Sequence, residues 1–288
     1  MRILPVVIAL IFVSHSLIGQ EVLAPSKVIF TRENGNAIII ENYAFTTCID
    51  SRVHIPLWVS HAISKELIDK GRISRDRPAV YSRDPQYLDL KKNAYASSGY
   101  DHGHMAPARD FKWNSGAWWE SFYMTNMAPQ HGCFNQKGWC HLESHCRKWA
   151  VTDSLNVIYI VTGIIPGDYI DTLCYTNDFK IFVPLYFFKA VLSYKKRSRT
   201  GKAIGFIMPN ESIDNAEIEA YATTIDKIES LSGLDLFSFL KNSIEDQLES
   251  EVGDFDFYEL LECPDKDCES IYSGNRTRPE DRTKLWCD

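Results

Sequence analysis

The strongest constraint on this chain is a dense group of ionisable residues between positions 98 and 110. Its centre reads Asp101-His102-Gly103-His104, so two histidines flank one glycine beside an acid. Few structural turns need that mixture, whereas a site that transfers protons or binds a metal does. Taken alone, the pattern also fits a zinc-binding pair or a turn with one hydrogen-bonded histidine. The motif alone therefore does not distinguish these interpretations, and residues further along the chain are needed.

A predicted helix supplies the next polar side chains. It begins near Asn135, thirty-one residues after His104, and runs to about Ser154, with apolar residues at helical spacing. At about 100° per residue, Glu143 is rotated by roughly 80° from Asn135, and Arg147 by roughly 40° further. The three side chains can therefore face one groove. Simpler explanations also exist, because Asn135 suits a helix N-cap and Glu143 with Arg147 suits an i,i+4 ion pair.

The remaining pattern predicts an α+β fold without a regular alternation of strands and helices. Tyr43–Ile49 and His54–Ile63 are rich in aromatic and β-branched residues, and we expect them to pair as a hairpin around Asp50–Arg52. Residues Lys70–Lys92 are polar and contain two prolines, so a loop is expected there. Further strands are predicted at 157–165, 181–192 and 203–208, and further helices at 117–123, 216–231 and 234–240.

The N-terminus has the order of a secretory signal peptide. Arg2 is basic, residues 3–13 are apolar, and residues 14–20 are small or polar. The apolar run is shorter than the roughly 18 residues that indicate a membrane span, and a retained anchor or a buried strand is the alternative. Eight cysteines agree with an oxidising compartment and with disulfide bonds. We therefore expect a secreted or periplasmic protein with no membrane contact once residues 1–19 are removed.

The charge of the chain is unevenly distributed. The formal net charge is −7, and residues 251–288 hold eleven acidic and five basic side chains, so the rest of the chain is close to neutral. That balance argues against a protein that coats nucleic acid tightly, but it is compatible with an enzyme that grips a few phosphates locally. We expect a main domain at residues 20–250 and an acidic, cysteine-containing C-terminal extension at 251–288.

A structural zinc module is one alternative for the middle of the chain. Histidines and cysteines are unusually dense there, although their spacing matches no standard zinc finger and export would favour disulfides over thiolates. The residues concerned are His131, Cys133, Cys140, His141, His145 and Cys146.

Taken in order, the motifs resemble the DNA/RNA non-specific endonuclease family, which includes mitochondrial endonuclease G and secreted bacterial nucleases. The resemblance runs from about Glu41 to Leu248 and implies an α+β, ββα-metal (His-Me finger) nuclease fold, with a central, mostly antiparallel sheet flanked by helices. It assigns residues 20–250 to the endonuclease domain. The motifs are Asp101-His102-Gly103-His104, Thr125-Asn126-Met127-Ala128-Pro129-Gln130, Asn135-Gln136, Trp139, Glu143, Arg147, Val183-Pro184, Met208-Pro209-Asn210 and residues 228–235.

The resemblance also implies a role for each polar residue. His104 would be the general base that activates water, and Asn135 would hold Mg²⁺, with Mn²⁺ or another divalent cation as a substitute. Glu143 would accept hydrogen bonds from water around the metal. Arg147 would hold a phosphoryl oxygen. DNA and RNA would both be substrates, since attack on phosphorus ignores the base and the 2′-hydroxyl.

Further residues are expected around the catalytic group, in substrate binding or behind it. They are Asp101, His102, Asn126 and Gln130, with Arg77 chosen as an upstream phosphate contact over Arg72, Arg75 and Arg83.

His102 departs from the family pattern. The usual signature is D-R-G-H, so histidine here removes a fixed positive charge near the phosphate. A non-catalytic nucleic-acid-binding or adhesive protein on a nuclease fold is therefore the second alternative, which the acidic extension also motivates. The oligomeric state is left open.

Overall fold

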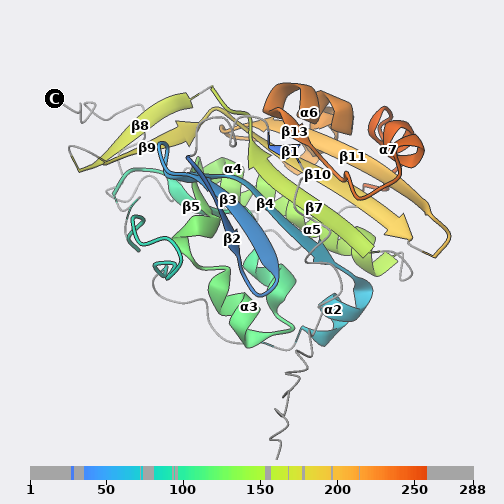
Figure 1. The fold of residues 1–288 in the computed structure, drawn as a ribbon, viewed down its shortest axis with the longest axis horizontal. Coiled ribbons are helices and arrows are strands. Elements are labelled where there is room, and N and C mark those ends of the chain that lie inside the picture. Colours follow the sequence, from blue (N-terminus) through green and yellow to red (C-terminus); the bar gives the residue numbers. More distant parts are fainter. Residues whose placement is uncertain are drawn as a thin grey trace, which may run out of the picture.

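The computed structural model describes residues 27–28, 36–71, 73, 81–92, 94, 97–152, 157–167, 169–176, 179–195, 197–213 and 215–257. A seven-stranded sheet crosses its centre, and every neighbouring pair of its strands is antiparallel (Figure 1). In spatial order the strands are β12 (Ala222–Thr223), β11 (Thr200–Pro209), β10 (Tyr186–Lys195), β7 (Val157–Ile164), β4 (Ile55–Ile63), β3 (Phe45–Asp50) and β2 (Ala37–Glu41). The predicted α+β fold with an antiparallel sheet is confirmed.

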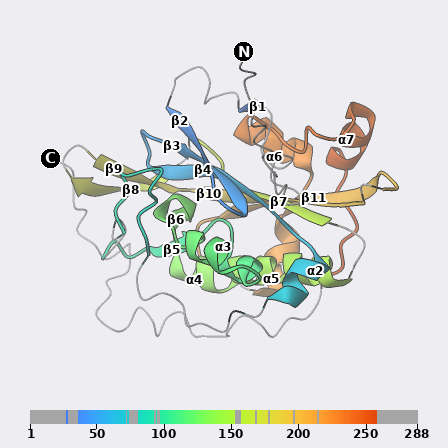
Figure 2. The ribbon, with the colours of Figure 1, turned by 60° about the horizontal axis from the view of Figure 1, so that its bottom comes forward.

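Helices cover both faces of this sheet (Figure 2). α5 (Gly138–Thr152) lies on one face, where Trp149 stacks on Phe206 of β11 with ring centroids 6.4 Å apart. α6 (Ile225–Ser232) lies on the other, where a Cβ atom at Gly205 would stand 2.6 Å from one of its side chains. Neighbouring residues of a strand point to opposite faces of the sheet, so Phe206 of β11 contacts α5 and the adjacent Gly205 contacts α6. The other helices are α2 (Lys65–Lys70), α3 (Ser115–Glu120) and α4 (Gly132–Gln136) on the side of α5, and α7 (Asn242–Glu249) beside α6.

Three two-stranded sheets complete the described fold. They pair β5 (Asp101–His104) with β6 (Met127–Gln130), β8 (Tyr169–Thr176) with β9 (Phe179–Pro184), and β1 (Lys27–Val28) with β13 (Leu234–Asp235). Short 3₁₀ helices link the elements: η2 (Ala108–Phe111), η3 (Met124–Asn126) and η4 (Asn215–Tyr221).

The predicted hairpin of strands is confirmed, but the single helix predicted beyond Asn135 is two helices. α4 ends at Gln136, the backbone of the following Lys137 (φ −111°, ψ −99°) is not helical, and α5 begins at Gly138. A Cβ atom at Gly138 would stand 2.9 Å from Cγ2 of Ile213, so the start of α5 depends on a glycine. Asn135 therefore lies in the last turn of α4 and is not a helix N-cap.

The strand predicted at 181–192 also divides. Its first part belongs to β9 in the small sheet with β8, which was not predicted, and its second part belongs to β10 in the central sheet. Pro184 ends β9, because proline has no N–H to donate to a further ladder bond. The two sheets therefore meet at this position.

Two predicted helices near the C-terminal end are only partly correct. Thr224 starts α6 inside the predicted 216–231 helix, since its side chain accepts a backbone hydrogen bond at 3.2 Å. Residues 234–240 do not form a helix, because Gly233 ends α6 in the left-handed region (φ 72°) and β13 follows. α7 was missed, and Glu249 is its one buried residue, so it offers a weak apolar stripe.

Residues 251–257 continue the packed domain across the boundary predicted at 250. The backbone N–H of Gly253 donates to the carbonyl of Ala203 at 2.7 Å. The Phe255 ring lies 4.7 Å from that of Trp149, measured between centroids. The first part of the predicted extension is thus built into the core.

The ends of the chain lie outside the described residues, including the predicted signal peptide at 1–19 and positions 258–288. In the part that is described, no helix has the length and apolar character needed to cross a membrane.

The described cysteines differ in state. Cys140 is disulfide-bonded. Cys48, Cys133 and Cys146 are buried thiols, so the prediction that the cysteines serve as disulfides is wrong for these three. Burial raises the pKa of Cys48 and of Cys146 to about 12, which keeps both protonated at neutral pH.

Asn210 joins the small sheets to the central one. Its side chain is buried, and Nδ2 donates to the carbonyls of Pro129 (3.2 Å) and Pro184 (3.0 Å). Its Oδ1 accepts from the backbone N–H of His131 at 2.7 Å. One side chain thus satisfies three backbone groups from the ends of β6 and β9.

We expect Asn210→Ala to lower the free energy of unfolding by about 2–4 kcal/mol, because it leaves buried backbone groups without partners. Urea unfolding followed by circular dichroism measures this. Asn242→Ala, the same change at an exposed position of α7, should stay within about 0.5 kcal/mol of the parent chain. Equal effects at the two positions would contradict the assigned role.

Candidate active site

The pairing of β5 with β6 places the two histidines. Asp101 lies opposite Gln130 and His104 opposite Met127, so alternation puts His102 and His104 on one face of the ribbon. The His104 ring packs edge-on against Phe122 at 5.2 Å between centroids. The Trp139 indole N–H donates to the His104 carbonyl at 3.4 Å. Backbone and ring of His104 are both held by neighbours.

A pocket of about 410 Å³ opens beside His104. It brings together three predicted site residues from different elements: His104 from β5, Asn135 from α4 and Glu143 from α5. The full lining is His104, Pro107, Ala108, Arg109, Lys112, Trp118, Phe122, Asn135 and Glu143. Of the three side chains predicted to face one groove, Asn135 and Glu143 line this pocket together with His104, whereas Arg147 does not.

Asp101 fixes the Asn135 side chain. Its Oδ2 accepts from Nδ2 of Asn135 at 3.0 Å and from Nε2 of Gln136 at 2.8 Å. The amide nitrogen of Asn135 is therefore committed to Asp101, and its carbonyl oxygen is the atom left for a ligand in the pocket. An oxygen held in this way suits a hard divalent cation.

Glu143 is a titratable group of the pocket whose surroundings shift its pKa strongly. Burial raises the pKa of Glu143 to about 7, against the opposing charges of Lys189 and Arg147. Lys189 is fully buried, with Nζ 2.7 Å from the Thr162 hydroxyl and 4.4 Å from the Trp139 ring centroid. Burial lowers the pKa of Lys189. A cation bound in the pocket would favour the ionised form of Glu143.

Arg147 does not line the pocket. It is 8% exposed, and Nη1 donates to Asp110 Oδ1 at 3.0 Å while Nη2 donates to the Ser144 hydroxyl at 2.8 Å. The other oxygen of Asp110 accepts from His61 Nε2 at 3.0 Å. Burial raises the pKa of Asp110, but the hydrogen bond from His61 and the charge of Arg147 outweigh it, so the net pKa is lowered. Arg147 is thus part of a buried ionic network beneath Glu143.

Asn126 and Gln130 lie behind the pocket. Asn126 is fully buried: Nδ2 donates to the carbonyls of Ala106 and Ser121, and Oδ1 accepts from the Ala106 N–H. Gln130 is also fully buried and covers Gly103, where a Cβ atom would stand 1.9 Å from its Oε1. Both residues shape the β5–β6 ribbon and contribute no atom to the pocket lining.

His102 stacks on Tyr81, with ring centroids 4.3 Å apart and planes 13° from parallel. Tyr81 also approaches His104 at 6.2 Å. The histidine that replaces the usual arginine is therefore held one aromatic ring away from His104. Arg77, the predicted phosphate contact, lies outside the described residues, as do Arg72 and Arg75.

Sequence reasoning missed several charged residues of this region. Arg109 and Lys112 line the pocket, and the signal for them was their place directly after the His104 motif. His61, Asp110 and Lys189 lie beneath it. His61 and Lys189 each sit in an apolar strand with no local motif, so no sequence signal marked them.

The zinc alternative finds no geometric support. Across the described ranges, the group of His, Cys and acidic side chains close enough to share an ion is Asp226, Glu229 and Glu249, far along the chain from the suspected module. Cys140 is also oxidised in a disulfide.

The chain matches the model of the DNA/RNA non-specific endonucleases over residues 27–243. It is 30% identical to Nuclease 1, mitochondrial, of Schizosaccharomyces pombe, across 73% of this chain and 69% of that protein. It is also 30% identical to human Endonuclease G, mitochondrial, across 69% of each chain. A crystal structure of an EndoG/EndoGI complex superposes with a TM-score of 0.58 at 24% identity, across 71% of this chain and 87% of that one, which supports the shared ββα-metal fold.

These relatives overturn the prediction of a secreted or periplasmic protein. The nucleases of fission yeast and human are named mitochondrial, as is the Mitochondrial nuclease of Saccharomyces cerevisiae, 31% identical across 72% of this chain and 68% of that protein. The signal peptide predicted at residues 1–19 lies outside the described residues, so the correction concerns the predicted location.

Glu143 yields a pH-dependent prediction for the cation-free protein. Its folded-state pKa lies above its ordinary value of 4.5, so its contribution to stability is present below about pH 4.5 and is lost as the pH rises through 7. Glu143→Gln removes this loss. Urea unfolding in a chelating buffer should show the variant gaining stability relative to the parent chain between about pH 5 and pH 8. Parallel pH profiles of the two proteins would contradict the raised pKa.

Proposed function

The chain belongs to the DNA/RNA non-specific endonuclease family, and from that membership we propose that it hydrolyses phosphodiester bonds with His104 as general base and Mg²⁺ as cofactor. Membership makes it a hydrolase acting on DNA and RNA. The observation that carries the proposed mechanism is the convergence of His104, Asn135 and Glu143 on one pocket. We assign catalysis to the domain predicted at residues 20–250, onto which residues 251–257 also pack.

His104 removes a proton from the attacking water. A neutral imidazole is required for this step, and attack in line with the leaving 3′ oxygen needs a fixed ring. The edge-on contact with Phe122 and the hydrogen bond from Trp139 to the His104 carbonyl support such fixation. The ring is thereby oriented before substrate arrives.

Asn135 would bind the cation through its side-chain oxygen, and Glu143 would accept hydrogen bonds from the surrounding water. Mg²⁺ suits this set because it prefers oxygen ligands and keeps much of its hydration, and Mn²⁺ or another divalent cation could replace it. When bound, the cation stabilises negative charge on the phosphate and on the leaving oxygen. Asp101 holds Asn135 in the required orientation.

Substrate phosphate would meet Arg109 and Lys112 at the pocket wall. Both are cations in a chain of negative net charge, so they form a local binding site for a polyanion. Arg147 would act through Glu143, since its guanidinium is anchored to Asp110 and its charge favours the ionised carboxylate. Arg77 stays a proposed additional phosphate contact. None of these contacts selects between DNA and RNA.

We expect the purified chain to digest plasmid DNA, single-stranded DNA and RNA with Mg²⁺ and to be inactive with a chelator. His104→Ala should lose about 10²–10⁴-fold in kcat, because it removes the assigned proton acceptor. Asn135→Ala should lose most activity and need more Mg²⁺, whereas Asn242→Ala should match the parent chain. A parent chain that binds DNA without cutting it across about pH 5 to 9 would favour the binding-protein alternative.

His102 provides a separate prediction on phosphate affinity. An ordinary imidazole carries its charge mainly below pH about 6.5, whereas arginine stays charged. His102→Arg should therefore raise kcat/KM several-fold at about pH 8, with a smaller gain at about pH 6. His102→Gln, which never carries charge, is the control and should match the parent chain at the higher pH. A gain of the same size at both pH values would contradict a charge effect.

A further inference from the structure

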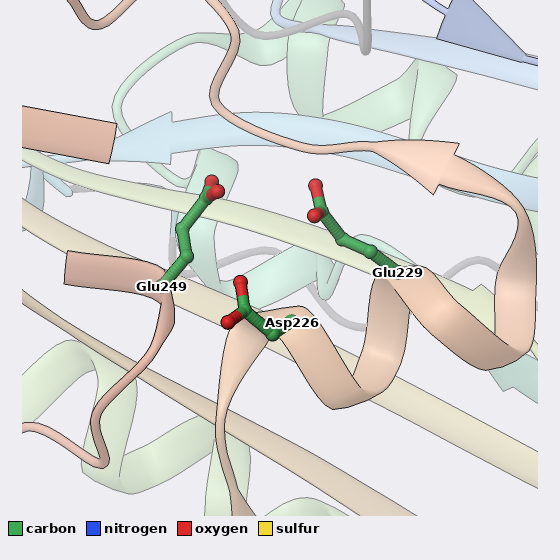
Figure 3. A group of neighbouring side chains, drawn as sticks. All are labelled: Asp226, Glu229 and Glu249. Carbon is green, nitrogen blue, oxygen red and sulfur yellow. The ribbon is translucent and has the colours of Figure 1, made fainter. Parts of the chain in front are cut away.

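A second group of carboxylates lies far from the pocket, on the α6–α7 side of the sheet (Figure 2). Asp226 and Glu229 come from α6, and Glu249 is the last residue of α7. One ligand oxygen from each lies within 4.8 Å of the others, and Figure 3 shows the three side chains facing one space. Asp226 is exposed, Glu229 is half-buried and Glu249 is buried.

Glu249 is the unusual member. It is 5% exposed and is the one buried residue of α7, whereas the apolar residues Ile244 and Leu248 of this helix pack against the core while only partly buried. Its Oε1 has no hydrogen-bond partner among the described residues. A buried carboxylate in this state is costly unless something compensates its charge.

The surroundings of Glu249 increase that cost. The charges that most strongly affect it are all negative, from Glu229, Glu245, Asp226 and Asp235. Glu229 already accepts a hydrogen bond at Oε1 from the backbone N–H of Leu236, which leaves its second oxygen for another ligand. No member of the group therefore neutralises another.

Two processes can relieve this charge: protonation or a bound cation. Burial raises the pKa of Glu249 to about 9 and that of Glu229 to about 7, so the cation-free cluster holds protons at neutral pH. A divalent cation would displace these protons and give the buried Oε1 of Glu249 a partner.

We propose that Asp226, Glu229 and Glu249 bind a divalent cation, with Ca²⁺ as the best fit, that fastens α7 to α6. Ca²⁺ takes carboxylate oxygens at 2.3–2.6 Å in flexible geometry, so two ligands of one ion lie at most about 5 Å apart. Mg²⁺, at about 2.0–2.1 Å, requires them closer together. The exposed side at Asp226 leaves room for water to complete the shell. This site is independent of the proposed nuclease mechanism.

Calcium titration calorimetry on the full chain tests the site, with Asn135→Ala as the background so that binding in the catalytic pocket is weakened. We expect one Ca²⁺ per chain at about pH 8, with tighter binding at higher pH because protons are displaced. Asp226→Asn and Glu249→Gln should each weaken binding at least tenfold. Asp246→Asn, at an exposed position of the same helix, should leave the affinity within about twofold.

Thermal unfolding provides the second readout. Ca²⁺ should raise the Tm of the background protein by a few degrees, and both cluster variants should lose this rise. Asp226→Asn changes an exposed residue and so tests the site even if Glu249→Gln does not fold. The proposal is overturned if Ca²⁺ up to about 10 mM produces neither binding heat nor a Tm change, or if Asp226→Asn binds Ca²⁺ as tightly as the background protein.

Discussion

The buried carboxylate of Asp110 is the contact on which the site depends. It accepts a hydrogen bond from His61 on β4 and another from Arg147 on α5, and it lies in η2, directly after the pocket-lining residue Arg109. The side chain of Asp110 in η2 thus joins the central sheet at β4 to helix α5. Removing one partner of a buried ion pair leaves an uncompensated charge, so these elements are tied to a single relative arrangement.

Buried cations next to the pocket affect the pKa of its carboxylate, Glu143. Arg147 and Lys189 are too buried to meet substrate, but both charges oppose the rise in the pKa of Glu143 that burial causes. Without them a carboxylate in this position would stay protonated through neutral pH. The buried cations therefore keep Glu143 close to its titration point, where a divalent cation can shift it to the ionised form.

The sequence predicted residues that line the pocket, but it did not predict the buried contacts behind them. The motif order that resembles the family predicted His104, Asn135 and Glu143 as site residues, although the helix expected to carry both Asn135 and Glu143 is two helices. The His61–Asp110 contact spans 49 residues and has no periodic signal, so only the folded chain reveals it. The break before Gly138 has the same origin, since it depends on Ile213 from a distant segment. Local patterns predict elements, whereas their interruptions depend on tertiary contacts.

The distribution of charge reconciles a negative chain with a polyanionic substrate. Acidic side chains gather around α6 and α7, on the face of the sheet opposite the pocket, whereas Arg109 and Lys112 line the pocket itself. Screening limits the reach of exposed charges to about 10 Å at 0.1 M salt, so the distant acids repel phosphate at the pocket only weakly. Net charge therefore says little about substrate here, because the local field at the pocket is set by the residues within that distance.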